Sequence, residues 1–323
     1  MINRRTCRIK TMQTLFAYYE DEKADINNYE QKLIQSLDAL EELYIWQLSF
    51  LVNIFDFESK RIEEAKNKFL PTEEDLHPNT KFINNAVIAK ISQNKEFCMK
   101  EKLYHISWVE NEEVVRAVLN SIKKSKLYIT YMNNKTDNEF NKDKTFIRKL
   151  FSEIFINSSV LIQFYEEKNI YWTVYDYDNV SFDIIKTLKS ITENSSPDDP
   201  LQLNDLKTEK DELKDKNFAK ELFYKTIIHG DACTQIINSY TNNWDVDRIA
   251  LLDIILCRMA ITEFTQFPSI PVNATISEYI EISKLFSTPK SSSFINGILD
   301  KIATDLEYKG EIIKKGRGLI KNS

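Results

Sequence analysis

Basic residues gather at the very start of the chain, before any carboxylate occurs. Arg4, Arg5, Arg8 and Lys10 all precede Glu20, which is the first acidic residue. On a helix, Arg4 and Arg8 would lie one turn apart with Arg5 beside them. The apolar positions of the same stretch would turn toward a core: Ile9, Met12, Phe16 and Tyr19. A cationic face of this kind is suited to RNA, although cations at a helix N-terminus oppose the helix dipole. From these residues alone, RNA contact and an ordinary solvated face explain the pattern equally well.

Residues suited to catalysis or metal binding are sparse. The three histidines, His77, His105 and His229, have no cysteine or second histidine at metal-ligand spacing, so we expect no zinc site. No GxSxG turn favours a Ser/His/Asp triad, and the paired Asp198 and Asp199 lie in a polar loop where solvated charge is the simpler interpretation. With only five glycines and no GxGxxG or GxxxxGK[ST] run, a phosphate-cradling loop is not expected. We therefore expect a protein that is not an enzyme and carries no cofactor.

Composition limits the class of protein further. The chain has 323 residues, of which 42% are apolar and 12% aromatic, which is ample for a packed core. The formal net charge is −6, so any RNA contact must come from a local basic patch. Four cysteines without CxxC spacing indicate reduced thiols, and neither a signal peptide nor an apolar run long enough to span a membrane is visible. We expect a cytoplasmic protein.

The elements that must position these residues are predicted to be helices throughout. Prolines fall almost wholly between long stretches rich in Leu, Ile, Lys and Glu, which indicates an all-α protein. The run from Trp244 to Glu263 is apolar nearly all the way round a 3.6-residue period, which predicts a helix at the centre of a bundle. Its neighbours are predicted from apolar residues at helical spacing downstream: Val272, Ile276, Tyr279, Ile280, Phe294, Ile298 and Ile302.

The organisation along the chain follows from these patterns. Residues 1–20 form a first helix, 214–305 a C-terminal bundle, and 306–323 a basic tail. Residues 21–213 are predicted to be a large helical insertion with a stripe of Leu33, Leu37, Leu40, Leu43 and Trp46. The polar connection 193–200 is the best candidate for a domain boundary.

An internal repeat is indicated within the insertion. Asp143, Phe146, Leu150, Phe151 and Trp172 match Asp215, Phe218, Leu222, Phe223 and Trp244 at one constant offset. A duplicated helical hairpin, covering about residues 143–192 in its first copy, explains the match, while shared composition of Leu- and Lys-rich helices is the alternative.

Taken together, the segments resemble the NusB family of transcription antitermination factors over about residues 1–20 and 215–305. The resemblance rests on the opening arginines, on Asp253 and the apolar helix that ends at Glu263, on the turn at Pro271, and on the Phe294 to Asp300 block. It implies an all-α, NusB-like helical bundle with a large helical insertion after the first helix. The function it implies is RNA-binding transcription antitermination on nascent ribosomal RNA.

The resemblance also implies partners and site residues. Expected partners are boxA-like single-stranded RNA, the small-subunit ribosomal protein NusE, and the RNA polymerase elongation complex. The RNA-binding residues carried over by position are Arg4, Arg5, Arg8, Phe294 and Asn296, with Lys290 adding positive charge beside Phe294. Asp247 and Asp253 occupy the positions expected to contact the ribosomal protein. Phe294 is explained equally well as a base-stacking ring or as a core phenylalanine.

One residue departs from the family pattern, and two alternative functions remain open. Ser277 stands where the family commonly has asparagine, which puts an amide-specific hydrogen bond there in doubt. Ribosomal-RNA cytosine methyltransferases carry a domain resembling NusB, but they need a glycine-containing cofactor fold after it, and this chain ends within about twenty residues of the resemblance. The other alternative is a protein-docking scaffold that has lost RNA binding.

Overall fold

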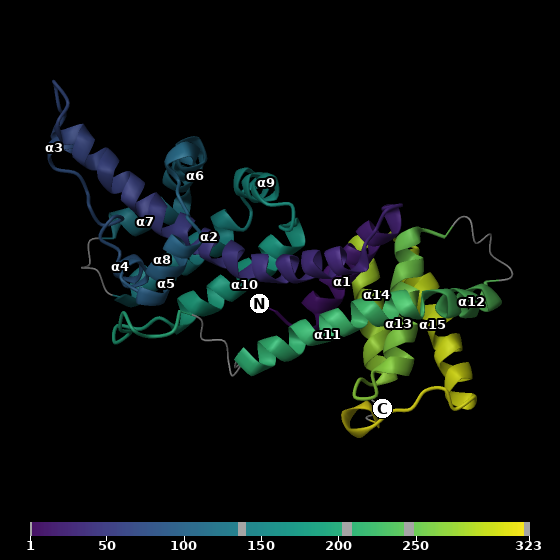
Figure 1. Ribbon diagram of the computed structural model, residues 1–323. Helices are drawn as coiled ribbons and strands as arrows, with labels where there is room; N and C mark the ends of the chain where they lie inside the picture. Colours follow the sequence, from purple (N-terminus) through teal and green to yellow (C-terminus); the bar gives the residue numbers. More distant parts are fainter. Residues whose placement is uncertain (1, 135–139, 202–208, 242–248, 320–323) are drawn as a thin grey trace. The chain divides into compact units, whose positions relative to one another are not determined.

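The protein is α-helical in every part that the structure describes. The structure is a computed structural model, and it describes residues 2–134, 140–201, 209–241 and 249–319. No strand occurs in these ranges, so the all-α prediction is confirmed. The chain divides into two compact units (Figure 1): unit 1 comprises residues 38–206, and unit 2 comprises residues 2–37 together with 207–323. None of the described helices is long and apolar enough to cross a membrane.

Unit 2 holds both ends of the described chain. Its helices are α1 (Arg4–Glu20), the beginning of α2 (Ile26–Lys66), α11 (Glu209–Ile228), α12 (Gly230–Tyr240), α13 (Leu251–Gln266), α14 (Val272–Phe286), α15 (Ser291–Tyr308) and the short η4 (Gly316–Leu319). The centre of this unit is α13, which packs against α1, α11, α12, α14 and α15 (Figure 1). The apolar run predicted to begin at Trp244 becomes helical at Leu251, while residues 242–248 lie outside the described ranges.

Burial on all sides of α13 follows from its composition. Its apolar side chains Ile255, Leu256, Met259, Ile261 and Phe264 are all buried. A helix that is apolar round its whole circumference needs neighbours on every side, and five surrounding helices supply them. Two carboxylates, Asp253 near its start and Glu263 in its last turn, are buried with it, and each therefore needs polar partners.

The first helix, α1, begins at Arg4 with Asn3 as its N-cap. The Asn3 side chain accepts a hydrogen bond from the Thr6 backbone N–H at 2.9 Å, which satisfies one of the N–H groups that a helix start leaves open. The first turn of α1 contains no acidic residue. Since its arginines oppose the helix dipole, negative charge must come from other helices.

Unit 1 is built on the rest of α2. Its further helices are α3 (Glu73–Leu76), α4 (Ala86–Ser92), α5 (Lys95–Leu103), η1 (Val109–Asn111), α6 (Glu112–Lys124), α7 (Lys126–Asn133), α8 (Phe140–Lys149), η2 (Leu150–Phe155), α9 (Ser159–Lys168) and α10 (Val174–Ser190). Aromatic side chains dominate its core: the Phe55 and Phe82 rings stack with centroids 4.0 Å apart, and Trp46 packs edge-on against Trp108 at 5.0 Å. The leucine stripe predicted on α2 is buried, with Leu33 and Leu37 in unit 2 and Leu40 and Leu43 in unit 1.

The two copies of the predicted repeat bury equivalent positions. Asp143, Phe146, Leu150 and Phe151 are buried in unit 1, and so are their counterparts at the constant offset in unit 2: Asp215, Phe218, Leu222 and Phe223. The first copy has a π-helical turn, η2, where α11 continues as an α-helix. Trp172 is buried and its indole N–H donates to the Ala39 carbonyl at 2.7 Å, whereas Trp244 lies outside the described residues. The duplication stays a prediction.

Candidate nucleic-acid interface

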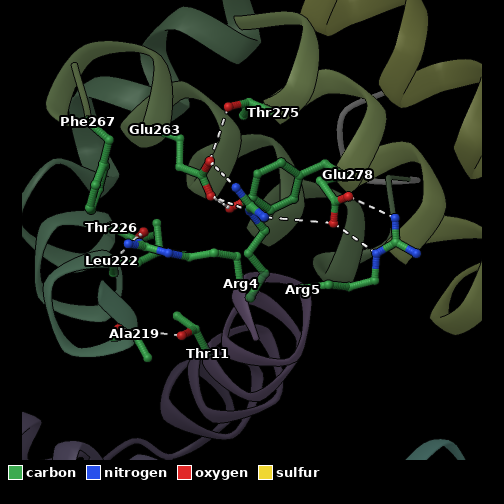
Figure 2. Close-up of polar contacts among 12 residues, drawn as sticks. Arg4, Arg5, Thr11, Ala219, Leu222, Thr226, Glu263, Phe267, Thr275 and Glu278 are labelled. Carbon is green, nitrogen blue, oxygen red and sulfur yellow. Dashed lines mark hydrogen bonds and ion pairs between the residues drawn. The ribbon is translucent and has the colours of Figure 1, made fainter. Parts of the chain in front are cut away.

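The three N-terminal arginines each meet a carboxylate from a different helix. Arg4 Nε lies 3.0 Å from Asp215 Oδ1 on α11. Arg5 donates two hydrogen bonds to Glu278 on α14, at 2.9 and 2.8 Å (Figure 2). Arg8 donates two to Glu263 on α13, at 2.7 and 2.9 Å. We call these three arginines and three carboxylates the arginine cluster; its positive and negative charges are equal in number.

Arg8 corrects the expectation of a solvent-facing arginine triplet. Its side chain is only 5% exposed, and that of Glu263 is fully buried. Glu263 also accepts hydrogen bonds from Tyr279 Oη at 2.8 Å and Thr275 Oγ1 at 3.1 Å (Figure 2). Burial alone would lower the pKa of Arg8, but the Glu263 carboxylate outweighs it and holds that pKa above its ordinary value. Arg8 therefore fixes α1 onto α13 and is not part of the surface.

Arg4 and Arg5 remain partly open to solvent. Their side chains are 48% and 43% exposed. The Arg4 guanidinium lies 4.1 Å from the centroid of the buried Phe218 ring, a cation–π contact that holds it on α11. Hydrogen bonds from Arg5 lower the pKa of the half-buried Glu278 carboxyl, so the pair is ionised at neutral pH. The outer edges of these two guanidinium groups are the part of the cluster that a phosphate can reach.

A groove in unit 2 brings together a second group of predicted residues. It has a volume of about 880 Å³ and lies between the end of α12, the start of α13 and the start of α15. Lys290, Phe294 and Lys301 line it, together with Tyr240 and Ile298. Both lysines are exposed and the Phe294 ring is half-buried. We call it the cationic groove, because Asp253 is the only acidic residue among the described residues that line it.

Asp253 is not the exposed partner-facing carboxylate that was expected. Its residue exposure is 6%, and its two oxygens accept hydrogen bonds from Ser287 Oγ at 2.6 Å and Ser291 Oγ at 2.7 Å. The carboxylate thereby ties the start of α13 to the loop before α15. Asp247, the other residue predicted to contact a partner, lies outside the described residues.

The predicted RNA-binding residues fall into two separate groups. None of the three arginines lines the cationic groove, and Asn296 is exposed on α15 without lining it. Among the described residues, no group of three or more His, Cys, Asp or Glu side chains could hold a metal ion. One group is the Phe294 ring with the lysines Lys290 and Lys301, which line the same groove, and the other is the pair of half-exposed guanidinium groups of Arg4 and Arg5.

Sequence reasoning missed Lys314, which lies beyond the last predicted helix. Its ammonium donates to the backbone carbonyls of Glu263 at 3.0 Å and Phe267 at 3.1 Å, at the end of α13. That helix has no basic residue in its own last turn, so Lys314 supplies the cation that the helix dipole favours there. Only the basic composition of the tail hinted at such a role.

Titration of Lys314 should make the stability of unit 2 depend on pH. Desolvation lowers its pKa to about 8 from the ordinary 10.5, although the Glu263 and Glu307 carboxylates partly oppose the shift. Between these two values the folded state binds fewer protons than the unfolded state, so stability should rise with pH across that window and be lower on the acidic side of it. We expect the unfolding free energy of the parent to rise, relative to Lys314→Met, between about pH 8 and about pH 10.5. A difference in unfolding free energy between the two proteins that does not change with pH would contradict the lowered pKa of Lys314.

The fold and these contacts define the class of protein to which unit 2 belongs. Unit 2 is an all-α bundle around one buried central helix, with a charge-paired first helix and a cationic groove beside the central helix. Residues 179–304 match the model of the NusB family, so the resemblance predicted from the sequence is confirmed over this part of the chain. The match begins within α10 and does not include α1.

Three relatives share the same printed name, transcription antitermination protein NusB. The protein from Salinibacter ruber is 42% identical over 105 residues, covering 32% of this chain and 66% of the relative. Those from Chloroherpeton thalassium and Thermodesulfovibrio yellowstonii are 37% and 41% identical, covering 34% and 28% of this chain. The chain thus spans between 52% and 66% of the length of these relatives. No solved structure matches the chain.

Proposed function

We propose that this chain is a non-enzymatic transcription antitermination factor that binds single-stranded RNA in the cationic groove of unit 2. The observation that carries this proposal is that Phe294, Lys290 and Lys301 line one groove of about 880 Å³. The groove lies within the residues that match the NusB family. The names of the relatives support transcription antitermination.

The groove has the parts that a single-stranded nucleic acid requires. A half-buried aromatic ring gives a base a surface on which to stack, and such a contact is worth ~1–3 kcal/mol. Lys290 and Lys301 are exposed, so their ammonium groups can reach phosphate oxygens. Against these two cations the described lining of the groove holds one carboxylate, that of the buried Asp253, so the positive charges exceed the negative by one. Arg4 and Arg5 would add phosphate contacts along the same strand.

The partners we propose follow the family resemblance. They are a boxA-like element of nascent ribosomal RNA, the ribosomal protein NusE, and the RNA polymerase elongation complex. Because Asp253 is buried, Asp247 is the remaining candidate for a carboxylate that attracts a basic ribosomal protein. Unit 1 lies largely outside the family match and would act as an accessory part.

RNA binding by substituted chains tests the groove directly. Phe294→Leu keeps an apolar side chain but removes the aromatic face, so affinity for a labelled single-stranded RNA should fall by roughly fivefold to 150-fold, the equivalent of ~1–3 kcal/mol. Lys290→Ala combined with Lys301→Ala should reduce the slope of log affinity against log salt by ~1.4, or ~0.7 for each phosphate contact. Fluorescence anisotropy at several salt concentrations measures both.

A matched control is Lys284→Ala on α14. Lys284 is an exposed lysine of unit 2 that pairs with Glu281 and does not line the groove. The Lys284→Ala variant should bind RNA as the parent does. Unchanged affinity in Phe294→Leu, together with an unchanged salt slope in the double lysine variant, would exclude the groove as the RNA site.

A further inference from the structure

The chain turns back on itself directly after α15. Gly310 adopts a φ of +73°, a conformation that glycine takes without steric cost. Its N–H donates to the Glu307 carbonyl at 3.0 Å, and the Glu311 N–H donates to the Leu306 carbonyl at 2.9 Å, which is the hydrogen-bond pattern of a helix end. We call residues 309–315 the C-terminal strap. The strap lies beyond residue 304, where the family match ends.

The strap is fastened at the end of α13. The Lys315 backbone N–H donates to the Pro268 carbonyl at 2.9 Å. The Lys314 ammonium donates to the carbonyls of Glu263 and Phe267, as described above. Three hydrogen bonds to three neighbouring carbonyls hold two consecutive residues in place.

This point of attachment adjoins the arginine cluster on two sides. Glu263, whose carbonyl accepts from Lys314, binds Arg8 through its side chain. Phe267 packs against the Phe218 ring with centroids 5.3 Å apart, and Arg4 lies over the Phe218 ring. The strap is therefore connected to Arg8 through Glu263, and to Arg4 through Phe267 and Phe218.

The charges of the cluster show what the strap adds. Three arginines and three carboxylates leave it without net charge, so by itself it attracts a phosphate chain weakly. The Lys315 side chain is exposed, and among the described residues no carboxylate lies within ion-pair distance of it. Lys314 and Lys315 thus add two cations at the end of α13, the helix whose Glu263 binds Arg8.

We propose that the C-terminal strap is part of the RNA-binding surface, with Lys315 contacting a phosphate of single-stranded RNA beside Arg4 and Arg5. This inference rests on the proposed RNA-binding function and adds a segment that the family match does not include. Lys314 positions the strap by binding the end of α13, and Lys315 faces the RNA. The strap thereby gives the charge-balanced cluster the net positive charge that RNA binding requires.

Substitution of Lys315 in the full chain separates this role from simple helix capping. Its side chain is exposed and only its backbone binds Pro268, so Lys315→Ala should leave the thermal unfolding midpoint unchanged. Loss of one phosphate contact should lower the salt slope by ~0.7, which means about fivefold weaker binding at 0.1 M salt and almost no difference near 1 M. Fluorescence anisotropy with a labelled single-stranded RNA of mixed sequence gives both values. Lys315→Glu should weaken binding further.

A control variant accounts for net charge. Lys102→Glu changes the charge by the same amount at an exposed position of unit 1 on α5, and it should bind RNA as the parent does. Equal affinity and equal salt slope in parent, Lys315→Ala and Lys315→Glu, while Arg5→Ala still weakens binding, would overturn the strap proposal alone. Absence of salt-dependent RNA binding in the parent would overturn the proposed function itself.

Discussion

Replacing Arg8 with methionine should lower the free energy of unfolding of unit 2 by about 3–5 kcal/mol, because it leaves the buried Glu263 carboxylate without its cation. Glu263 is fully buried and would retain only the hydroxyls of Tyr279 and Thr275 as hydrogen-bond donors. Methionine fills a similar volume, so the loss reports the charge and the hydrogen bonds more than a cavity. α1 should detach from α13 before the rest of the bundle unfolds.

Hydrogen exchange of the α13 backbone amides is the appropriate measurement, because it reads unit 2 separately from unit 1. The matched control is Arg5→Met, which breaks a pair with the same two-hydrogen-bond geometry but with a side chain 43% exposed. Exposed pairs of this kind are worth about 1 kcal/mol or less. Arg8→Met combined with Glu263→Leu should regain much of the loss, since no buried charge then remains. Equal protection in Arg8→Met and Arg5→Met would contradict a structural role for the buried pair.

The helices of this protein could be predicted from sequence because apolar spacing is a local property. The run that contains α13 is apolar on nearly every side, and most of its apolar side chains are buried in the structure, although the polar Asp253, Thr262 and Glu263 are buried with them. The stripe on α2 is also buried as expected, but spacing within one helix does not show that Leu37 and Leu40 belong to different units. That division depends on which distant helices pack at each end.

The environments of the charged residues could not be predicted in the same way. Arg8 and Glu263 are 255 residues apart in the chain, and Arg5 and Glu278 are 273 apart. A local pattern indicates that arginines share one side of a helix, but only packing decides which of them is buried against a carboxylate. Phe294 and Lys290 are close in sequence, so a local pattern can pair them, whereas Lys301 joins them in the groove only through the turns of α15.

Reversing the charge of Asp253 should destabilise unit 2 more than it alters any association rate. Its carboxylate occupies the first turn of α13, where the helix dipole favours negative charge, and it accepts hydrogen bonds from Ser287 and Ser291. Asp253→Lys would place a cation at a site that is 6% exposed and leave both hydroxyls without their acceptor. We expect a loss of about 3–5 kcal/mol, as for other buried charges whose partners are removed.

Two further variants distinguish this structural role from a role in partner binding. Asp253→Asn keeps the shape and one acceptor oxygen, so it should cost about 1.5–3 kcal/mol, the usual range for hydrogen bonds to a charged group. Asp231→Lys is the control: Asp231 is an exposed carboxylate in the first turn of α12, where a charge is worth only about 0.3–1 kcal/mol. Hydrogen exchange at the start of α15 would report the loss locally, because Ser291 opens that helix. The contrary result would be that Asp253→Lys unfolds no more readily than Asp231→Lys but binds a basic partner protein more slowly. The carboxylate would then serve the partner interface, and its hydrogen bonds from Ser287 and Ser291 would not stabilise the fold.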